Sequence, residues 1–313
     1  MLKRICAFLL VVFLPITAFA APISVSAQSA IVINSTDNSV IYSKNAYSSM
    51  PMASTTKIMT CVLACESTRL NDTVVVTNEM LAGTEGSLIY LKPDDKITLY
   101  DLAVAAMLAS GNDAANAVAF CLSGSIADFV ALMNKKACSI GMKNSCFSKI
   151  CALKSAQITI NGKKQTVYNH NKLLSSDNDF VGVKTGFTEK AGRCLVSAYN
   201  YNGNMIITVT LNAPDDWQDH KRLVAFAKKQ FTTKKDNKTF ALDVVGAPKN
   251  TVQCGYEYNV TVYKNVDIRL YYYPFVYAPL KCGDTVGECK IYSNNRLIKT
   301  VDITVRENIN YGE

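Results

Sequence analysis

The sequence predicts an α+β protein in which an antiparallel sheet with helices packed on it is followed by a small β-sandwich. Three observations predict this class. Helical apolar spacing predominates from residue 55 to 139, and strand-like runs return between residues 157 and 211. After Thr239 the pattern changes to short alternating or aromatic strands, broken by Pro274 and by glycines. The chain has 313 residues, 49% of them hydrophobic, which is enough for two domains with separate cores.

The first twenty residues have the pattern of an export signal. Lys3 and Arg4 precede an apolar run, Ile5–Leu14, and Ala18-Phe19-Ala20 supplies the small residues of a cleavage site. Ten apolar residues are too few to span a bilayer, and no later segment is a clear membrane anchor. We therefore expect cleavage near Ala21 and an exported, extracytoplasmic protein, in the cell wall or periplasm. The expected organisation is a signal peptide at 1–20, a first domain at 21–238 and a C-terminal β-rich domain at 239–313.

The strands and helices of the first domain follow from local patterns. Ala30–Asn34 and Val40–Ser43 flank a turn and predict a hairpin. A second hairpin is predicted around Asn202-Gly203, between Arg193–Ala198 and Met205–Leu211. An amphipathic helix follows from Trp217 to Phe231. These strands would form the sheet on which the helices pack.

Ser54 and Lys57 are the strongest candidates for chemistry, because they place a hydroxyl and an amine one helical turn apart. Residues 58–65 carry no charged side chain, so the helix that they form should be buried. Burial would lower the pKa of Lys57, and its neutral amine could then act as the base for a Ser54 nucleophile. The alternative is a Ser54 that only caps the helix and a Lys57 that reaches solvent.

Two further motifs follow along the chain. Ser110-Gly111-Asn112 falls between two helical patterns and predicts a tight turn that can aim both polar side chains at one point. Lys184-Thr185-Gly186 ends a strand-like run, Phe180–Val183, where a strand edge would present a cation, a hydroxyl and N–H groups together. Each motif alone would more simply be an ordinary turn or strand end. Their order is that of active-site serine enzymes that act on penicillin and D-Ala-D-Ala peptides.

The chain resembles the low-molecular-mass penicillin-binding proteins, specifically the serine-type D-alanyl-D-alanine carboxypeptidases. The resemblance is strong from about Ser29 to Phe231 and weak beyond. It implies a β-lactamase/transpeptidase-like fold for the first domain. The segments that carry it are Pro51-Met52-Ala53-Ser54-Thr55-Thr56-Lys57, Leu108-Ala109-Ser110-Gly111-Asn112-Asp113-Ala114-Ala115, Asn169-His170-Asn171-Lys172-Leu173-Leu174, Lys184-Thr185-Gly186-Phe187-Thr188 and Lys190-Ala191-Gly192.

This resemblance implies a hydrolase of the cell wall that trims the terminal D-alanine from peptidoglycan stem peptides. Ser54 would form an acyl-enzyme, which water then releases. Lys57 would take the serine proton, and Ser110 would pass a proton to the departing amine. β-Lactam antibiotics would be covalent inhibitors, and no cofactor is expected.

The resemblance also implies a set of substrate-binding residues. Asn112 would orient the peptide, while Lys184 and Thr185, followed by Gly186, would hold its terminal carboxylate. The backbone N–H groups of Ser54 and Phe187 would form an oxyanion hole, a device worth about 3 kcal/mol per donor.

Two departures from the family pattern change what is expected. Between Met142 and the strand Gln157–Ile160 the chain is short and lacks a helical segment, which predicts a thinner roof over the site. The C-terminal residues Asn308–Glu313 do not form the basic amphipathic face with which the family often ends.

Two rival functions share these motifs. A class A β-lactamase deacylates through a glutamate between the second and third motifs, but no glutamate occurs from Asp113 to Val183. The other rival is a non-catalytic or merely penicillin-binding exported protein, in which the short segment has cost activity and the β-rich domain binds a partner. The complete set of motif residues favours the carboxypeptidase.

The charge, cysteine and histidine content indicates which binding partners, disulfides and metal sites to expect. A formal net charge of +8 could suit nucleic acid, but the export signal and the scattered basic residues argue against that partner. The excess charge suits attraction to an anionic cell wall and to a substrate carboxylate, and an ordinary solvated surface explains it equally well. Ten cysteines follow the signal, and Cys282 and Cys289 are the best candidates for a local disulfide. A zinc site is not expected, because the chain has no Cys-x-x-Cys pair and only two histidines, His170 and His220.

Overall fold

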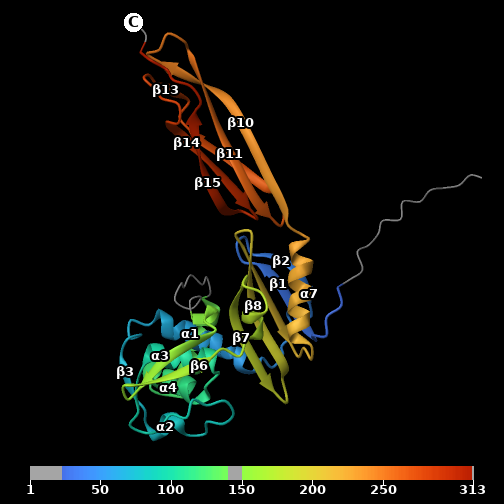
Figure 1. Ribbon diagram of the computed structural model, residues 1–313, viewed down its shortest axis with the longest axis vertical. Helices are drawn as coiled ribbons and strands as arrows, with labels where there is room; N and C mark the ends of the chain where they lie inside the picture. Colours follow the sequence, from blue (N-terminus) through green and yellow to red (C-terminus); the bar gives the residue numbers. More distant parts are fainter. Residues whose placement is uncertain (1–22, 140–149, 312–313) are drawn as a thin grey trace, which may run out of the picture.

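The computed structural model describes residues 23–139 and 150–311. A part with helices and two sheets precedes a C-terminal sheet that extends from one end of the molecule (Figure 1). This arrangement is the predicted α+β class. The predicted signal peptide and residues 143–149 of the short segment after Met142 lie outside the described residues. Within the described part, no single helix could cross a membrane by length and composition, and the one helix pair that passes together bends by 82°.

A five-stranded antiparallel sheet forms the centre of the first part. Its strand order is β2-β1-β9-β8-β7, so β7 lies at an edge. Both predicted hairpins are present, and Asn202 and Gly203 make the β8–β9 turn with φ angles of 48° and 79°, as a two-residue hairpin requires. The strands are β1 (Ser29–Asn34), β2 (Ser39–Lys44), β7 (Phe180–Thr188), β8 (Gly192–Tyr201) and β9 (Asn204–Leu211).

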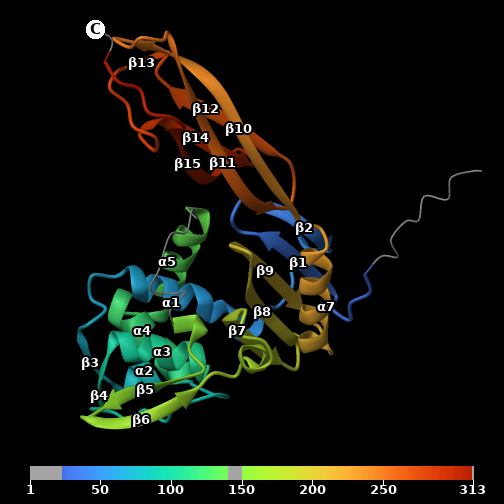
Figure 2. The same cartoon turned by 45° about the horizontal axis from the view of Figure 1, so that its top comes forward.

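The two faces of this sheet are covered by different elements. Helix α7 (Asp216–Lys228) packs on one face, where its Leu223 and Ala227 join Leu195 and Ile206 in one buried cluster. Helices α1, α3 and α4 gather beyond the other face (Figure 2), in a cluster that includes Ala198 of β8. The sheet is therefore buried between two apolar layers.

Helices predominate from residue 55 to 139, as the apolar spacing predicts. Their starts carry polar caps: the Thr98 and Ser125 side chains accept hydrogen bonds from the N–H groups of Asp101 and Asp128. The helical elements are the 3-10 turn η1 (Ala53–Thr56), α1 (Lys57–Glu66), α2 (Asn78–Leu81), α3 (Leu99–Leu108), α4 (Asn112–Ser123) and α5 (Ile126–Cys138).

A second, four-stranded sheet packs beside these helices. Two of its strands, β3 (Thr73–Val75) and β4 (Lys96–Thr98), interrupt the helical region and were not predicted, because three residues are too few to show a strand period. They pair in the order β3-β4-β5-β6 with β5 (Ser155–Ile160) and β6 (Lys163–Tyr168).

The C-terminal part is one six-stranded sheet, in the order β12-β14-β15-β11-β10-β13, that curls over its own apolar cluster. Strands β11 and β15 pair only through Cys254–Val305 and Gly255–Thr304, which lets the two halves face each other as in a sandwich. β10 crosses the expected limit at residue 239, so the exact division into domains stays a prediction. The strands are β10 (Thr232–Val245), β11 (Thr251–Val262), β12 (Val266–Tyr272), β13 (Phe275–Tyr277), β14 (Thr285–Ser293) and β15 (Arg296–Val305).

The expected disulfide between Cys282 and Cys289 is absent from the structure. Both thiols are free: Cys289 points into the core from β14, whereas Cys282 is exposed in the preceding turn. The strand that begins at Thr285 turns the second cysteine inward, which sequence proximity could not reveal.

Candidate active site

Ser54 and Lys57 meet where η1 passes into α1. The Lys57 Nζ lies 3.0 Å from the Ser54 Oγ and 2.5 Å from the Asn112 Oδ1, and donates a hydrogen bond to each. Lys57 is 4% exposed, in a helix that is buried along most of its length. The alternative of a lysine that extends to solvent is therefore excluded by the structure.

Burial favours the neutral amine of Lys57, which is the form that can act as a base. Desolvation of the ammonium lowers the pKa of Lys57 from its usual value to about 8, and the Asp113 carboxylate opposes only part of that shift. A useful fraction of the amine is then neutral near neutral pH, next to the serine hydroxyl.

The second motif forms the tight turn between α3 and α4. Ser110 is 5% exposed and adopts a φ of 59°, a left-handed conformation that few residues other than glycine take up. Asn112 is the first residue of α4. Its Nδ2 donates a hydrogen bond to the carbonyl oxygen of Glu85, and its backbone N–H donates to the carbonyl oxygen of Ser87 at 2.7 Å. The turn thus brings Ser110 to the site and Asn112 to Lys57.

Asp113 fixes the loop that faces this turn. Its buried carboxylate accepts hydrogen bonds from the N–H groups of Ile89 and Leu91, each at 3.1 Å. Charge-assisted bonds of this kind are the stronger class of hydrogen bond. Asn112 and Asp113 together hold the loop that carries Ser87 against the cleft.

The third motif lies inside β7, whereas the sequence pattern predicts that the strand-like run ends at this motif. β7 runs on to Thr188 because Lys184 to Thr188 pair in register with β8, for example Thr185 with Leu195. A Cβ on Gly186 would stand 3.0 Å from the Ser54 backbone nitrogen. The absence of a side chain at Gly186 is what lets the strand approach the serine so closely.

Lys184 is buried beside the site, and its expected role in holding the terminal carboxylate stays a prediction. It is 1% exposed, and its Nζ donates to the carbonyl oxygen of Thr185 at 2.8 Å. Burial, reinforced by the Lys57 charge, lowers the pKa of Lys184 to about 7. Lys184 lies behind the wall of the site with Lys57 and Asn112 and does not line the cleft itself.

A cleft of about 350 Å³ opens over the Ser54 hydroxyl. Five residues of the predicted set line it: Ser54, Ser110, Thr185, Gly186 and Phe187. Six other lining residues had been given no role from sequence: Ser87, His170, Lys172, Arg193, Asp216 and Trp217. His170 and Lys172 belong to a segment that already carried the family resemblance, so for these two a signal was present.

Of the other four, Arg193, Asp216 and Trp217 form one unit in the lining of the cleft. Asp216 Oδ1 accepts from Arg193 Nε at 3.0 Å and from Nη2 at 2.8 Å. The guanidinium carbon lies 5.6 Å from the centre of the Trp217 ring, within cation–π range. Since β8 and α7 supply these residues, no local pattern in the sequence could reveal the unit.

The chain is similar in sequence to known proteins over much of its length. Residues 16–158 and 148–215 match the D-alanyl-D-alanine carboxypeptidase family, peptidase S11. The chain is 30% identical to D-alanyl-D-alanine carboxypeptidase DacF of Bacillus subtilis, over 66% of this chain and 63% of that protein. It is 29% identical to DacC of Escherichia coli, over 95% of this chain and 88% of that one. The match thus spans less than two thirds of DacF but most of DacC.

Solved structures show the same fold. Penicillin-binding protein 5 of Haemophilus influenzae superposes with a TM-score of 0.60 at 22% identity, covering 92% of this chain and 99% of that one. A peptidoglycan synthesis regulatory factor (PBP3) of Streptococcus pneumoniae superposes with a TM-score of 0.65 at 21% identity, covering 92% and 100%. With the family match over more than half of its length, the chain belongs to the D-alanyl-D-alanine carboxypeptidase family of serine peptidases.

Proposed function

We propose that this protein is an exported carboxypeptidase that removes the terminal D-alanine from peptidoglycan stem peptides through an acyl-enzyme on Ser54. One observation carries the proposal: the buried Lys57 amine lies 3.0 Å from the Ser54 hydroxyl beneath an open cleft. Family membership supports the reaction class, and the N-terminal sequence pattern supports export.

The first half of the reaction forms the acyl-enzyme. Ser54 Oγ attacks the carbonyl carbon between the two terminal D-alanines while neutral Lys57 accepts the hydroxyl proton. The N–H groups of Ser54 and Phe187 would stabilise the tetrahedral oxyanion, and Gly186, the neighbour of Phe187, lies close to the Ser54 backbone nitrogen. The C–N bond then breaks, and the departing amine receives a proton through Ser110. D-Alanine leaves, and the rest of the peptide remains esterified to Ser54.

The second half is hydrolysis of that ester. A water molecule enters the cleft, gives a proton to Lys57 and attacks the acyl carbon; the bond from this carbon to Ser54 Oγ then breaks, and Lys57 returns the proton to Oγ, which releases the shortened peptide and restores the Ser54 hydroxyl. The chain has no glutamate between Asp113 and Val183, the stretch where a class A β-lactamase carries its deacylating base. We therefore expect β-lactams to inhibit this protein as long-lived covalent adducts, and penicillin hydrolysis to be slow.

Covalent labelling with a fluorescent penicillin, paired with D-alanine release from a pentapeptide ending in D-Ala-D-Ala, tests the proposal. Wild type should label and release D-alanine, Ser54→Ala should do neither, and the exposed Ser155→Ala on β5 serves as the matched control. Peptide mapping should locate the adduct on Ser54. Label retained in Ser54→Ala would refute the assignment, and label without D-alanine release would favour a penicillin-binding protein that does not trim peptides.

A further inference from the structure

Arg193 lines the cleft, whereas Lys184, the cation of the third motif, is buried behind it. A peptide that ends in D-alanine brings a free carboxylate to the site, and that charge needs a cation it can reach. We propose that Arg193, together with the Thr185 hydroxyl, binds this terminal carboxylate, with Asp216 and Trp217 as positioning residues. This inference rests on the proposed function and assigns the specificity of the same site.

Strand geometry brings Arg193 and Thr185 together. Arg193 on β8 stands directly opposite Phe187 on β7, and Thr185 lies two residues from Phe187 along β7. Side chains two apart on a strand, and those directly opposite across a strand pair, share one face of the sheet. Thr185 is therefore the diagonal neighbour of Arg193, a separation that a long side chain can bridge. Lys184 belongs to the opposite face.

The guanidinium is held in a way that leaves it able to bind an anion. Arg193 Nε and Nη2 both donate to one oxygen of Asp216, whose side chain is 4% exposed, while the Arg193 side chain is 42% exposed. Arginine carries five N–H donors in a planar fork, so donors remain for a two-point contact with a carboxylate. Asp216 and the Trp217 ring restrict the side chain before substrate arrives.

The other nearby basic residues fit this role less well. The Lys184 ammonium donates to the Thr185 carbonyl oxygen, and burial favours its neutral form. Lys172 lines the cleft from the 3-10 turn η2 (Lys172–Ser175), but no ion pair within the described residues fixes its position. The pKa of His170 is lowered, chiefly by burial and further by Lys184, which favours a neutral ring. Among the basic residues that the structure describes at the cleft, Arg193 alone combines exposure to the cleft with a fixed geometry.

The experiment compares two peptides that share the scissile bond: one ends in a free D-alanine carboxylate and the other in its neutral carboxamide. Arg193→Ala should lower kcat/KM for the acid roughly 10- to 100-fold, the loss expected for a charge-assisted contact, while the amide changes by less than about threefold. Arg193→Lys keeps the charge without the fork and should recover part of the preference for the acid. Asp216→Asn should raise KM for the acid more than it lowers kcat.

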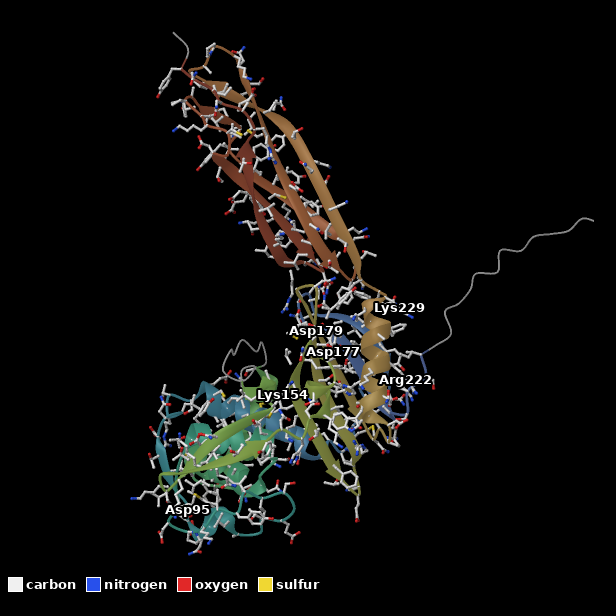
Figure 3. All side chains as sticks on the ribbon, viewed as in Figure 1. Asp95, Lys154, Asp177, Asp179, Arg222 and Lys229 are labelled. Atoms are coloured by element: carbon white, nitrogen blue, oxygen red, sulfur yellow. The ribbon has the colours of Figure 1, made fainter. Side chains whose placement is uncertain are left out.

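Arg222→Ala is the matched control. Arg222 is an exposed arginine of the same helix as Asp216 (labelled in Figure 3), and it does not line the cleft. Loss of acid and amide activity by the same factor in Arg193→Ala would overturn the inference, because only a structural role acts on both equally. Collapse of the acid preference in Lys172→Ala, with Arg193→Ala unaffected, would also overturn it.

The two proposals fail in distinguishable ways. If wild type neither labels with penicillin nor releases D-alanine, the proposed function is wrong and this inference falls with it. If wild type is active but the acid-to-amide ratio survives in Arg193→Ala, only the assignment of Arg193 is wrong.

Discussion

The region around Ser54 and the C-terminal sheet bury different kinds of side chain. Lys57, Asp113, Lys184, Asp216 and His220 are all buried in the first region. Among the described residues of the C-terminal sheet, the buried polar side chain is Ser293, which donates to Asp37 at the junction of the two parts. Buried charges cost free energy unless they are well paired. The first region thus surrounds its site with buried ionisable groups that are paired or have pKa values shifted toward the neutral form, whereas the second region is held by apolar packing.

Lys57→Arg should have the largest effect on activity, because it replaces the buried base of the first region with a side chain that keeps its charge. A guanidinium stays protonated at any pH a protein tolerates, so it cannot accept the Ser54 proton. Loss of a general base typically lowers the rate by about 10²- to 10⁴-fold, and we expect kcat to fall within that range. Stopped-flow acylation by a chromogenic β-lactam measures this step directly. Acylation at the wild-type rate would exclude Lys57 as the base.

The contact between Ser54 and Lys57 could be predicted from sequence because three residues of helix bring them together. The close approach of Gly186 to Ser54 follows from the fold only, since the two residues lie 132 positions apart and meet across different elements. Lys184 shows the same limit: its residue type suits a carboxylate, but its burial depends on the packing of β7 against the helices.

For the C-terminal sheet, the sequence was enough to predict strands that share an apolar core, but it was not enough to predict how those strands pair. Alternating apolar residues indicated strands with a common core, and that core exists. The parallel pairing of β13 with β10 and the narrow β11–β15 contact arise from how the sheet curls, which depends on twist accumulated over many residues. No short segment of sequence carries that information.

Ile291→Ala tests the apolar packing of the second region. Ile291 on β14 is fully buried, so the truncation should lower the free energy of unfolding by about 2–5 kcal/mol. Urea unfolding of the full chain measures the loss, and the half-exposed Leu297→Ala on β15 is the control, with an expected change below about 0.5 kcal/mol. Activity per folded molecule should stay unchanged. A large drop in kcat in folded Ile291→Ala would show that the two regions are coupled.

Gly186→Ala should disturb the site without removing any reactive group. The new Cβ would press on backbone atoms of Ser54, Thr55 and Met52 at 3.0–3.1 Å, so η1 must move by a few tenths of an ångström. Misplacement of a nucleophile is costly, and we expect kcat/KM to fall roughly 10- to 100-fold. Penicillin labelling should slow in parallel, while the unfolding midpoint changes little. Full activity would mean that the strand is not held as closely as the structure places it.

The pH dependence follows from the lowered pKa of Lys57. Only the neutral amine accepts a proton, and with a pKa of about 8 its neutral fraction grows about tenfold between pH 7 and pH 9. We therefore expect kcat/KM to rise with pH over this interval and then level off. Rates of D-alanine release measured between pH 7 and pH 9 test this rise in kcat/KM. A rate that does not change from pH 6 to pH 9, or one that rises only above pH 10, would contradict a buried base at this position.

Cys282→Ser should have the smallest effect and bears on the second region alone. In the structure the Cys282 thiol is exposed and unbonded, while Cys289 packs in the core, so the substitution should change the free energy of unfolding by less than about 0.5 kcal/mol. Alkylation of the native protein followed by mass spectrometry should modify Cys282 and spare Cys289, because the two thiols differ in access. Resistance of Cys282 to alkylation, together with a stability loss of several kcal/mol, would indicate a disulfide. In that case a covalent bond, in addition to the apolar core, would be holding the C-terminal sheet.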